Sequence, residues 1–184
     1  YMSVLIKLFY VIVININFKG CLMNVNIVPF LDKYQDQTTN LIFSIQEDEL
    51  KLNVSREERV DLQDIAAFYM KDNSSLFCLA LYRNNVVGTI SISYISKRKM
   101  ALHNMYIHKD FRGTIYDTAN KLLKESIHFA SDHMAREIYL GTGLDFYAAH
   151  KFYEKNGFME VEKEVLPSDF PFMSCDEKFY ELIL

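Results

Sequence analysis

From residue 23 to the C-terminus, short apolar runs alternate with segments whose apolar residues recur at helical spacing. The apolar runs bounded by polar turn residues predict strands at residues 25–28, 76–82, 86–95, 100–107, 137–140, 158–161 and 177–184. Helical periodicity predicts helices at residues 31–46, 62–70, 119–130 and 146–155. Antiparallel strands are thus followed by a strand–helix–strand–helix–strand unit. We therefore expect the α/β (α+β) class, with a mixed, mostly antiparallel central sheet and helices on both faces.

Local signals add detail to this pattern. The clearest helix carries on one face Ala119, Leu122, Leu123, Ser126, Ile127 and Ala130. Arg83-Asn84-Asn85 has the asparagine character of a hairpin turn, and Asn156-Gly157 is a strong signal for the end of a helix. The acidic run at residues 47–49 predicts a loop after the first helix, and the charged run at residues 55–64 predicts a solvated or loop-like segment. The last strand, at residues 177–184, is expected to close the sheet.

Composition limits the class of protein. With 184 residues, half of them apolar, the chain is expected to form one globular domain with a sizeable core. Its net charge of −4 provides no basic surface, so we expect no nucleic-acid partner. The three cysteines form no CxxC pair, which is typical of reduced thiols in a cytoplasmic protein. The five histidines lack metal-ligand spacing, so no metal site is expected.

Residues 1–22 form an apolar extension that stands apart from this pattern. The run at residues 4–18 is interrupted by Lys7 and is too short to span a bilayer, so we expect no membrane partner. It also lacks the basic start and the small-residue cleavage site of a secretory signal. Two interpretations stay open: translated sequence upstream of a start at Met23, or an extra strand of the domain.

Several segments, taken in order, resemble the GNAT superfamily of acetyl-CoA-dependent N-acetyltransferases. Residues 86–90 resemble its second hairpin strand, and residues 105–107 resemble the strand whose backbone pairs with the pantetheine arm. Phe111-Arg112-Gly113 resembles the opening of its pyrophosphate loop, and residues 152–158 resemble its fourth-helix signature. The tail at residues 166–171 is similar to a bacterial subgroup whose acceptor is unknown. The resemblance implies a single acetyltransferase domain over residues 23–184.

The resemblance also implies where the site lies. Acetyl-CoA is the expected cofactor, and the residues implied to bind it are Met105, Tyr106, Ile107, Arg112, Gly113, Thr114, Ile115, Tyr116, Asp117, Thr118, Thr142, Ala149 and Phe152. Tyr153 is the expected catalytic residue, because a phenol of pKa about 10 can protonate a departing thiolate at neutral pH. A neutral amine would attack the thioester directly, so no nucleophilic side chain is required.

The pyrophosphate loop departs from the family pattern. Ile115 and Asp117 stand where the family has small residues, and a carboxylate at residue 117 would repel a diphosphate. An alternative is that residues 114–117 form a capping box in which Asp117 satisfies its own helix. Phe146 also replaces an asparagine that touches the pantetheine in many family members.

The acceptor is expected to be an amine of a small molecule or a peptide. Glu47, Glu49 and His103 are the candidate substrate-binding residues, and Asp48 is a further candidate base beside them. An acidic segment would attract a cationic acceptor. A homodimer is one possible assembly. The alternative function, favoured by Ile115 and Asp117, is a ligand-sensing or interaction module with weakened acetyl-CoA binding.

Overall fold

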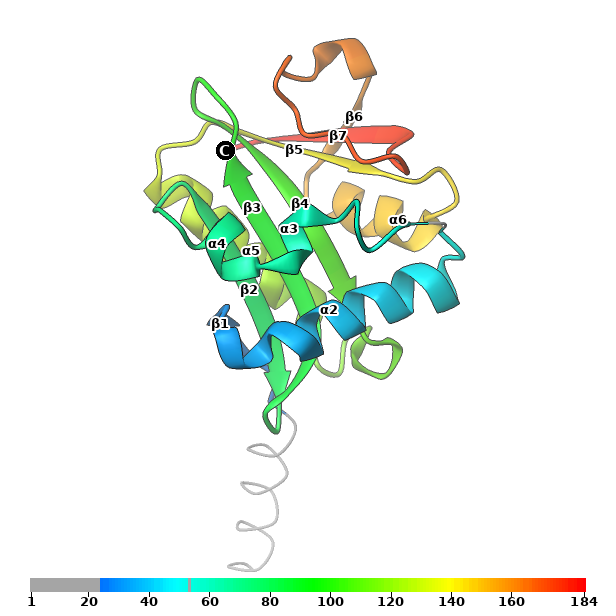
Figure 1. Cartoon of the computed structure of the whole chain (residues 1–184). Helices are drawn as coiled ribbons and strands as arrows, with labels where there is room; N and C mark the ends of the chain where they lie inside the picture. The colour runs from blue at the N-terminus through cyan, green and yellow to red at the C-terminus, as the bar shows by residue number, and fades with distance from the viewer. Residues whose placement is uncertain (1–23, 53) are drawn as a thin grey trace, which may run out of the picture.

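The computed structural model describes residues 24–52 and 54–184, so the predicted extension at residues 1–22 lies outside the described residues. The sheet has the strand order β1-β2-β3-β4-β5-β7-β6 (Figure 1). The strands are β1 (Asn26–Pro29), β2 (Ser75–Tyr82), β3 (Asn85–Tyr94), β4 (Lys99–Ile107), β5 (Glu137–Thr142), β6 (Met159–Val161) and β7 (Lys178–Ile183). The α-helices are α2 (Gln35–Ser44), α3 (Val60–Gln63), α4 (Ile65–Tyr69), α5 (Thr118–Asp132) and α6 (Tyr147–Lys155).

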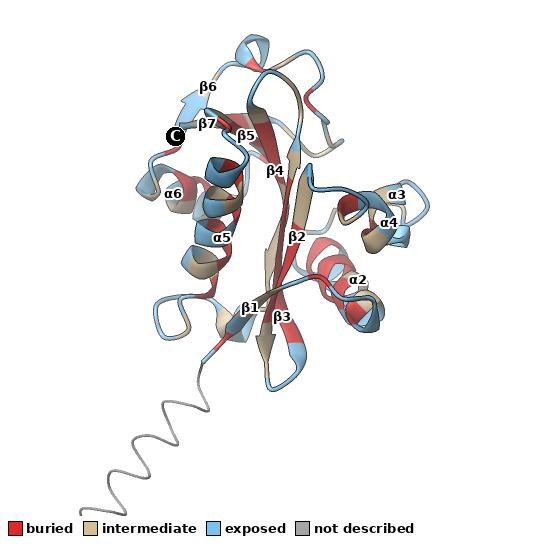
Figure 2. Cartoon of the chain, turned by 90° about the vertical axis from the view of Figure 1, so that its left-hand side faces the viewer, coloured by how far each residue is buried: buried red, intermediate tan, exposed pale blue. Residues whose placement is uncertain are grey.

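The layers match the predicted fold class. Helices α5 and α6 cover one face of the sheet, and α2, α3 and α4 cover the other (Figure 2). Strands β4 and β5 pair in parallel, while every other pair among the described strands is antiparallel. The expectation of a mixed, mostly antiparallel sheet with helices on both faces is therefore confirmed.

Alternation along β2 explains the two cores. Phe77 and Leu79 pack into the cluster under α2 and α4, whereas Cys78 and Ala80 pack into the cluster under α5 and α6. Successive side chains of a strand point to opposite faces, so a strand buried on both faces becomes apolar throughout. The hairpin to β3 turns at Arg83 and Asn84, which both have positive φ, as a primed turn requires.

Three expectations about local structure are wrong. The acidic run belongs to a π-helical turn, Ile45–Glu49, which continues α2 instead of ending in a loop. The predicted helix at residues 62–70 is interrupted at Asp64, whose extended backbone and side chain cap α4 through the Ala67 N–H. Strand β7 does not lie at the edge of the sheet, because it inserts between β5 and β6. The remaining short turns are 3-10 helices at Asp32–Tyr34, Lys109–Phe111 and Lys163–Val165.

The seam between β4 and β5 shapes the site. Their ladder covers Lys99 with Glu137, Met100 with Ile138 and Ala101 with Tyr139. Beyond these three pairs the strands part. Further along β4, the β3–β4 register shifts at Asn104, whose φ of 52° marks a bulge. The Thr89 hydroxyl donates to the Asn104 carbonyl over 2.6 Å and fixes this bulge.

Candidate active site

A cavity of about 570 Å³ opens where β4 and β5 part. Its walls come from β4 residues 102–107, from Gly141 and Thr142 at the end of β5, and from α6. Since β5 does not accompany this half of β4, the backbone groups on that edge of β4 lack a strand partner among the described residues. Unpaired strand edges bind extended chains through main-chain hydrogen bonds.

Tyr153 lines this cavity from α6. Its side chain is 6% exposed and packs against Phe158, with ring centroids 5.5 Å apart. Its hydroxyl donates to the Met105 sulfur over 3.6 Å, a weak partner. Burial raises the pKa of Tyr153 well above its usual value, so the phenol holds its proton at neutral pH. Tyr153 thus carries a proton inside the cavity at neutral pH, and the same burial makes it a weaker acid than a free phenol.

The loop after β4 provides the polar end of the cavity. Arg112 and Gly113 line it, and Gly113 has a φ of +85°, which favours glycine. The Arg112 guanidinium donates to the Ile107 carbonyl over 2.7 Å and to Glu49 Oε2 over 2.6 Å. The loop is anchored by an aromatic cluster, in which the Phe111 ring lies 4.8 Å from Tyr116 and 5.1 Å from Tyr82.

Of the two interpretations of residues 114–117, the capping box is wrong. Helix α5 begins at Thr118, so Asp117 is the N-cap residue itself and not a residue of the first turn. Asp117 has a φ of 53° and makes no capping hydrogen bond within the described chain; its carboxylate accepts instead from the Asn120 side chain over 2.5 Å. The first N–H groups of α5 are therefore not occupied by their own acidic residue.

The predicted cofactor-binding residues fall into two groups. Those that line the cavity are Met105, Tyr106, Ile107, Arg112, Gly113, Thr142, Ala149 and Phe152. The second group does not line it and consists of Thr114, Ile115, Tyr116, Asp117 and Thr118. Within this group Ile115 is 80% exposed, whereas Thr118 is buried, and a Cβ on Gly88 would lie 3.2 Å from its methyl group.

The predicted substrate-binding residues also lie in different places. Glu49 lines the cavity but is paired with Arg112, while Glu47 pairs with Arg56 over 3.3 Å at the surface. His103 lies between this cavity and a second one. Burial lowers the pKa of His103 to about 4, so the ring is neutral at physiological pH and is a weak base.

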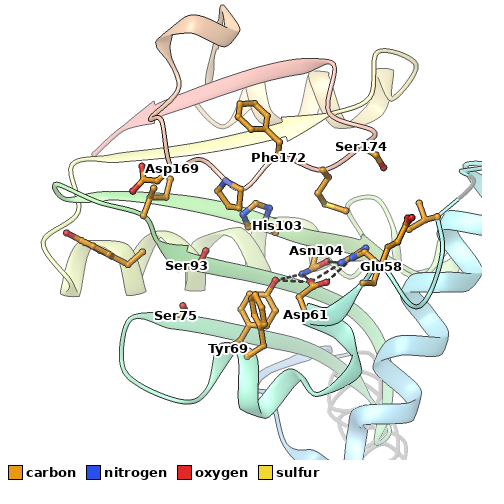
Figure 3. Close-up of a pocket in the computed structure, with 17 residues that line it drawn as sticks. Glu58, Asp61, Tyr69, Ser75, Ser93, His103, Asn104, Asp169, Phe172 and Ser174 are labelled. Carbon is orange, nitrogen blue, oxygen red and sulfur yellow. Dashed lines mark hydrogen bonds and ion pairs between the residues drawn. The ribbon is translucent and has the colours of Figure 1, made fainter.

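A second cavity, of about 670 Å³, is lined in part by Ser75 of β2, Ser93 of β3 and His103 of β4 (Figure 3). It shares His103, Asn104 and Met173 with the first, so the two cavities meet at the bulge. Arg59 and Asp61 line it and form an ion pair, with Nε 2.9 Å from Oδ1. The prediction of a solvated or loop-like segment at residues 55–64 is wrong at Arg59, which is only 7% exposed.

Asp176 is a site residue that the sequence pattern did not reveal. It lines the first cavity, and its Oδ2 accepts the Met173 N–H over 2.8 Å. Its carboxyl packs against Gly141, where a Cβ would overlap it. Burial raises the pKa of Asp176 to about 6. Only its place before the last strand, in a turn, could have drawn attention to it.

Within residues 24–52 and 54–184, no helix has the length and apolarity that crossing a bilayer requires. In the same residues, no three histidine, cysteine or acidic side chains are grouped closely enough to hold a metal ion.

Comparison with known sequences gives a family and distant relatives. Residues 39–158 match the acetyltransferase (GNAT) family. The N-acetylaspartate synthetase of Danio rerio is 35% identical over 102 residues, which cover 55% of this chain and 36% of that protein. The probable N-acetyltransferase camello of Xenopus tropicalis is 31% identical over 116 residues, covering 62% of this chain and 52% of that protein. The chain thus spans about a third of the first relative and about half of the second.

Solved structures resemble the chain over most of its length. A GNAT-family acetyltransferase from Staphylococcus aureus Mu50 has a TM-score of 0.81 and 32% identity, covering 85% of this chain and 97% of that one. An acetyltransferase from Streptococcus agalactiae 2603 has a TM-score of 0.82 and 26% identity, with coverage of 87% and 98%. The PaiA N-acetyltransferase of Thermoplasma acidophilum, solved with coenzyme A, shares the fold with a TM-score of 0.69 and 16% identity, covering 87% and 99%. The family match and these likenesses together show that the chain belongs to the GNAT family of acetyltransferases.

Proposed function

We propose that this chain is an N-acetyltransferase that moves an acetyl group from acetyl-CoA to an amine by direct attack. The observation that carries the proposal is the parting of β4 and β5, which leaves a cavity lined by Tyr153 and by Arg112 and Gly113. Family membership supports the reaction class. The N-acetylaspartate synthetases among its relatives, named for an acetylated amino acid, support a small-molecule acceptor.

The residues present fit acetyl-CoA. The unpaired edge of β4 at residues 105–107 suits the amide groups of a pantetheine arm. The first N–H groups of α5, which no side chain of the described residues caps, and the positive φ of Gly113 suit a pyrophosphate. A diphosphate at Arg112 would compete with the Glu49 carboxylate. Relatives of the same fold bound to coenzyme A or acetyl-CoA support this assignment.

Direct attack by an amine requires few catalytic groups from the protein. Acetyl-CoA supplies a reactive thioester. Backbone N–H groups beside the bulge at Asn104 would stabilise the negative charge that develops on the carbonyl oxygen, and Tyr153 would donate a proton to the departing sulfur. Among the titratable side chains of the cavity, Asp176 is the best proton acceptor for the amine, since its pKa of about 6 is close to neutral.

Two measurements test the proposal. Calorimetric titration of the full chain with desulfo-CoA should give micromolar binding. Thiol release from acetyl-CoA should then depend on added amine, measured over a panel of amino acids, alkylamines, polyamines and peptides. Absence of binding at millimolar desulfo-CoA, or binding without amine-dependent thiol release, would contradict the proposed enzyme.

The second candidate function is a ligand-sensing or interaction module. The specific observation that favours it is the loop between Gly113 and α5, where Ile115 is exposed and the Asp117 carboxylate lies at the helix N-terminus. A negative side chain there weakens attraction for a diphosphate. The calorimetric titration separates the two candidates, because the sensor would bind the cofactor weakly or not at all.

A further inference from the structure

The Asn104 side chain is held by hydrogen bonds at both of its polar atoms. Asn104 is 4% exposed, and its Oδ1 accepts from Arg59 Nη2 over 2.5 Å. Its Nδ2 lies 2.9 Å from the Tyr69 hydroxyl oxygen and 3.1 Å from Ser91 Oγ. A third oxygen, Asp61 Oδ2, lies 3.2 Å from the same nitrogen. A carboxamide nitrogen has two N–H donors, so three acceptors within reach leave neither donor without a partner.

The residues that hold Asn104 are also fixed to one another. Arg59 Nε donates to Asp61 Oδ1 over 2.9 Å, and Arg59 Nη2 donates to Asp61 Oδ2 over 3.0 Å. The Tyr69 hydroxyl donates to Asp61 Oδ2 over 3.0 Å (Figure 3). Burial alone would raise the pKa of Asp61, yet the hydrogen bonds and charge of Arg59 bring it below its usual value. Asp61 therefore stays ionised at neutral pH, and the ion pair stays in place.

Stability alone does not explain this ion pair. Arg59 is 7% exposed and the Asp61 side chain is 17% exposed, so both charges have lost most of their water. The cost of removing two charges from water can exceed their attraction, and apolar residues of similar volume often stabilise a fold as well. A guanidinium and a carboxylate that share two hydrogen bonds do adopt one planar geometry. The pair is therefore better explained by the position that it gives to Asn104.

Asn104 is the residue at which β4 bulges. Its φ is 52°, and the β3–β4 register shifts beside it. A left-handed backbone is uncommon outside glycine, although asparagine adopts it more readily than most residues, and it persists where the surroundings hold it. Here the Thr89 hydroxyl holds the Asn104 carbonyl, while Arg59 and its partners hold the Asn104 side chain. Both contacts fix the bulge.

The bulge lies next to the unpaired edge of β4. Asn104 and residues 105–107 line the first cavity together with Tyr153. Tyr106 is held from the helical layer as well, since Gln46 Nε2, in the turn that continues α2, donates to its hydroxyl over 2.7 Å. Side-chain anchors at Asn104 and Tyr106 thus keep this part of β4 in one position. Bulges beside active sites commonly redirect the groups that do the chemistry.

We propose that Arg59 and Asp61 are positioning residues: by holding the Asn104 side chain they fix the β4 bulge, and with it the backbone N–H groups that stabilise the charge developing on the thioester carbonyl oxygen. This inference rests on the proposed N-acetyltransferase function. Arg59 and Asp61 act through Asn104, and neither lines the first cavity. Preorganised donors stabilise a transition state when they point at the place where charge develops, so a small displacement of the bulge lowers the rate.

The test uses the full chain, with kcat measured by thiol release from acetyl-CoA and affinity by calorimetry with desulfo-CoA. Asn104→Gly removes the side chain that Arg59 holds, while glycine still adopts a φ of 52°. We expect kcat to fall by about 10- to 100-fold with desulfo-CoA affinity unchanged, because a misplacement of about 1 Å costs up to about 100-fold in rate. A kcat equal to that of the unaltered chain would overturn the inference.

Tyr69→Phe is a milder test, because it removes the hydroxyl that bonds both Asp61 and Asn104 and keeps the ring. Loss of one hydrogen bond should lower kcat by about 3- to 10-fold. Tyr34→Phe is the matched control, since Tyr34 is 5% exposed and packs in the same apolar cluster as Tyr69. It should retain the parent kcat. An equal fall in both variants would overturn the inference, because it would reflect packing of the core.

Asp61→Asn tests the ion pair itself. It keeps the shape of the side chain and leaves Arg59 without an ionised partner, so kcat should fall at least as far as in Tyr69→Phe. The stoichiometry of desulfo-CoA binding counts the folded sites in each preparation, so kcat is expressed per folded site. If Asp61→Asn does not fold, Asn104→Gly and Tyr69→Phe still decide the inference.

The outcomes separate this inference from the proposed function. Absence of amine-dependent thiol release with the unaltered chain would overturn both. Release by the unaltered chain, with kcat unchanged in Asn104→Gly and Tyr69→Phe, would overturn the positioning role alone. A loss of desulfo-CoA affinity as large as the loss of kcat would also overturn it, since that is the result of a general structural role.

Discussion

At the scale of single residues, the site combines side chains whose protonation is set by burial. Tyr153 and Asp176 line the same cavity, and burial raises the pKa of both. The Tyr153 phenol therefore stays protonated at neutral pH, while the Asp176 carboxyl has a pKa of about 6, close to neutral pH. A donor and an acceptor of protons with separated pKa values are what acyl transfer to an amine needs.

Replacement of Tyr153 by Phe should lower kcat about 10²- to 10⁴-fold and leave acetyl-CoA affinity unchanged, since the ring packing is kept and the proton is lost. Steady-state kinetics and desulfo-CoA calorimetry measure both. Tyr180→Phe is the control, because Tyr180 is buried beside Tyr153, with ring centroids 6.0 Å apart, and lies outside the cavity lining. Full turnover in Tyr153→Phe, with chemistry shown to be rate-limiting, would remove Tyr153 from the mechanism.

Asp176→Asn should change the pH dependence of stability. The folded-state pKa of Asp176 is raised to about 6, so the folded chain holds the proton more tightly than the unfolded chain, and the free energy of unfolding falls as pH rises from about 4 to 6. Asparagine removes that loss and can still accept the Met173 N–H. The variant should therefore be more stable at pH 7.5 by about 1–3 kcal/mol, with the difference vanishing below pH 4.

Thermal unfolding across pH 4–8 measures this difference, and Asp48→Asn controls for the loss of one exposed negative charge. Asp176→Asn should also lower kcat/KM for the amine and remove the acid limb of the pH profile of kcat/KM. A variant that is less stable at every pH would show that Asp176 acts through the turn at Met173 alone.

At the scale of elements, the start of α5 decides how the polar end of the cavity behaves. Sequence periodicity located the helix but not its first residue, because the Thr114–Asp117 pattern resembled a capping box. In the structure Asp117 adopts a left-handed backbone with a φ of 53°, so a glycine would be favoured at this residue. The penalty expected for loss of a helix cap therefore does not apply.

Asp117→Gly should tighten desulfo-CoA binding by about 2- to 10-fold, because removal of the carboxylate exposes the helix N-terminus to the diphosphate. Stability should change by no more than about 1 kcal/mol, since relief of the positive φ offsets the greater freedom of the unfolded chain. Calorimetry and thermal unfolding are measured on the same preparation. Asp117→Asn removes the charge and keeps the side chain, so it separates the two effects; weaker binding in both folded variants would assign Asp117 a direct role in holding ligand.

At the scale of the molecule, the sequence predicted the layers well and the second cavity poorly. The apolar β2 and the periodic α5 are recognisable because neighbouring residues determine them. Arg59 and Asp61 belong to a charged run of the kind that is usually exposed to solvent. In the structure they bond to Asn104 and Tyr69, which lie outside this run. Long-range partners of this kind leave no local pattern, and the same holds for Asp176 against Gly141.

The boundary of the domain is also a whole-molecule question. The described core begins at Val25, which is 2% exposed, and the family match lies at residues 39–158. A chain that begins at Met23 should therefore unfold cooperatively with the same thermal midpoint as the full chain. Circular dichroism melts of both proteins test this. A midpoint lower by more than about 5 °C, beyond what 1 kcal/mol produces in a domain of this size, would mean that residues 1–22 contribute to the core.

Mechanically, the sheet is two panels, β1 to β4 and β5 with β7 and β6, joined along a seam of three paired positions. Past that seam the described strands β4 and β5 are not paired, and the first cavity lies where they part. A ligand that forms hydrogen bonds with β4 and packs on α6 would connect the two parts of the sheet and oppose their separation. Binding of a ligand in the cavity would then make the whole sheet more rigid. Because the seam is short, ligand binding and the stability of the folded sheet would be thermodynamically linked.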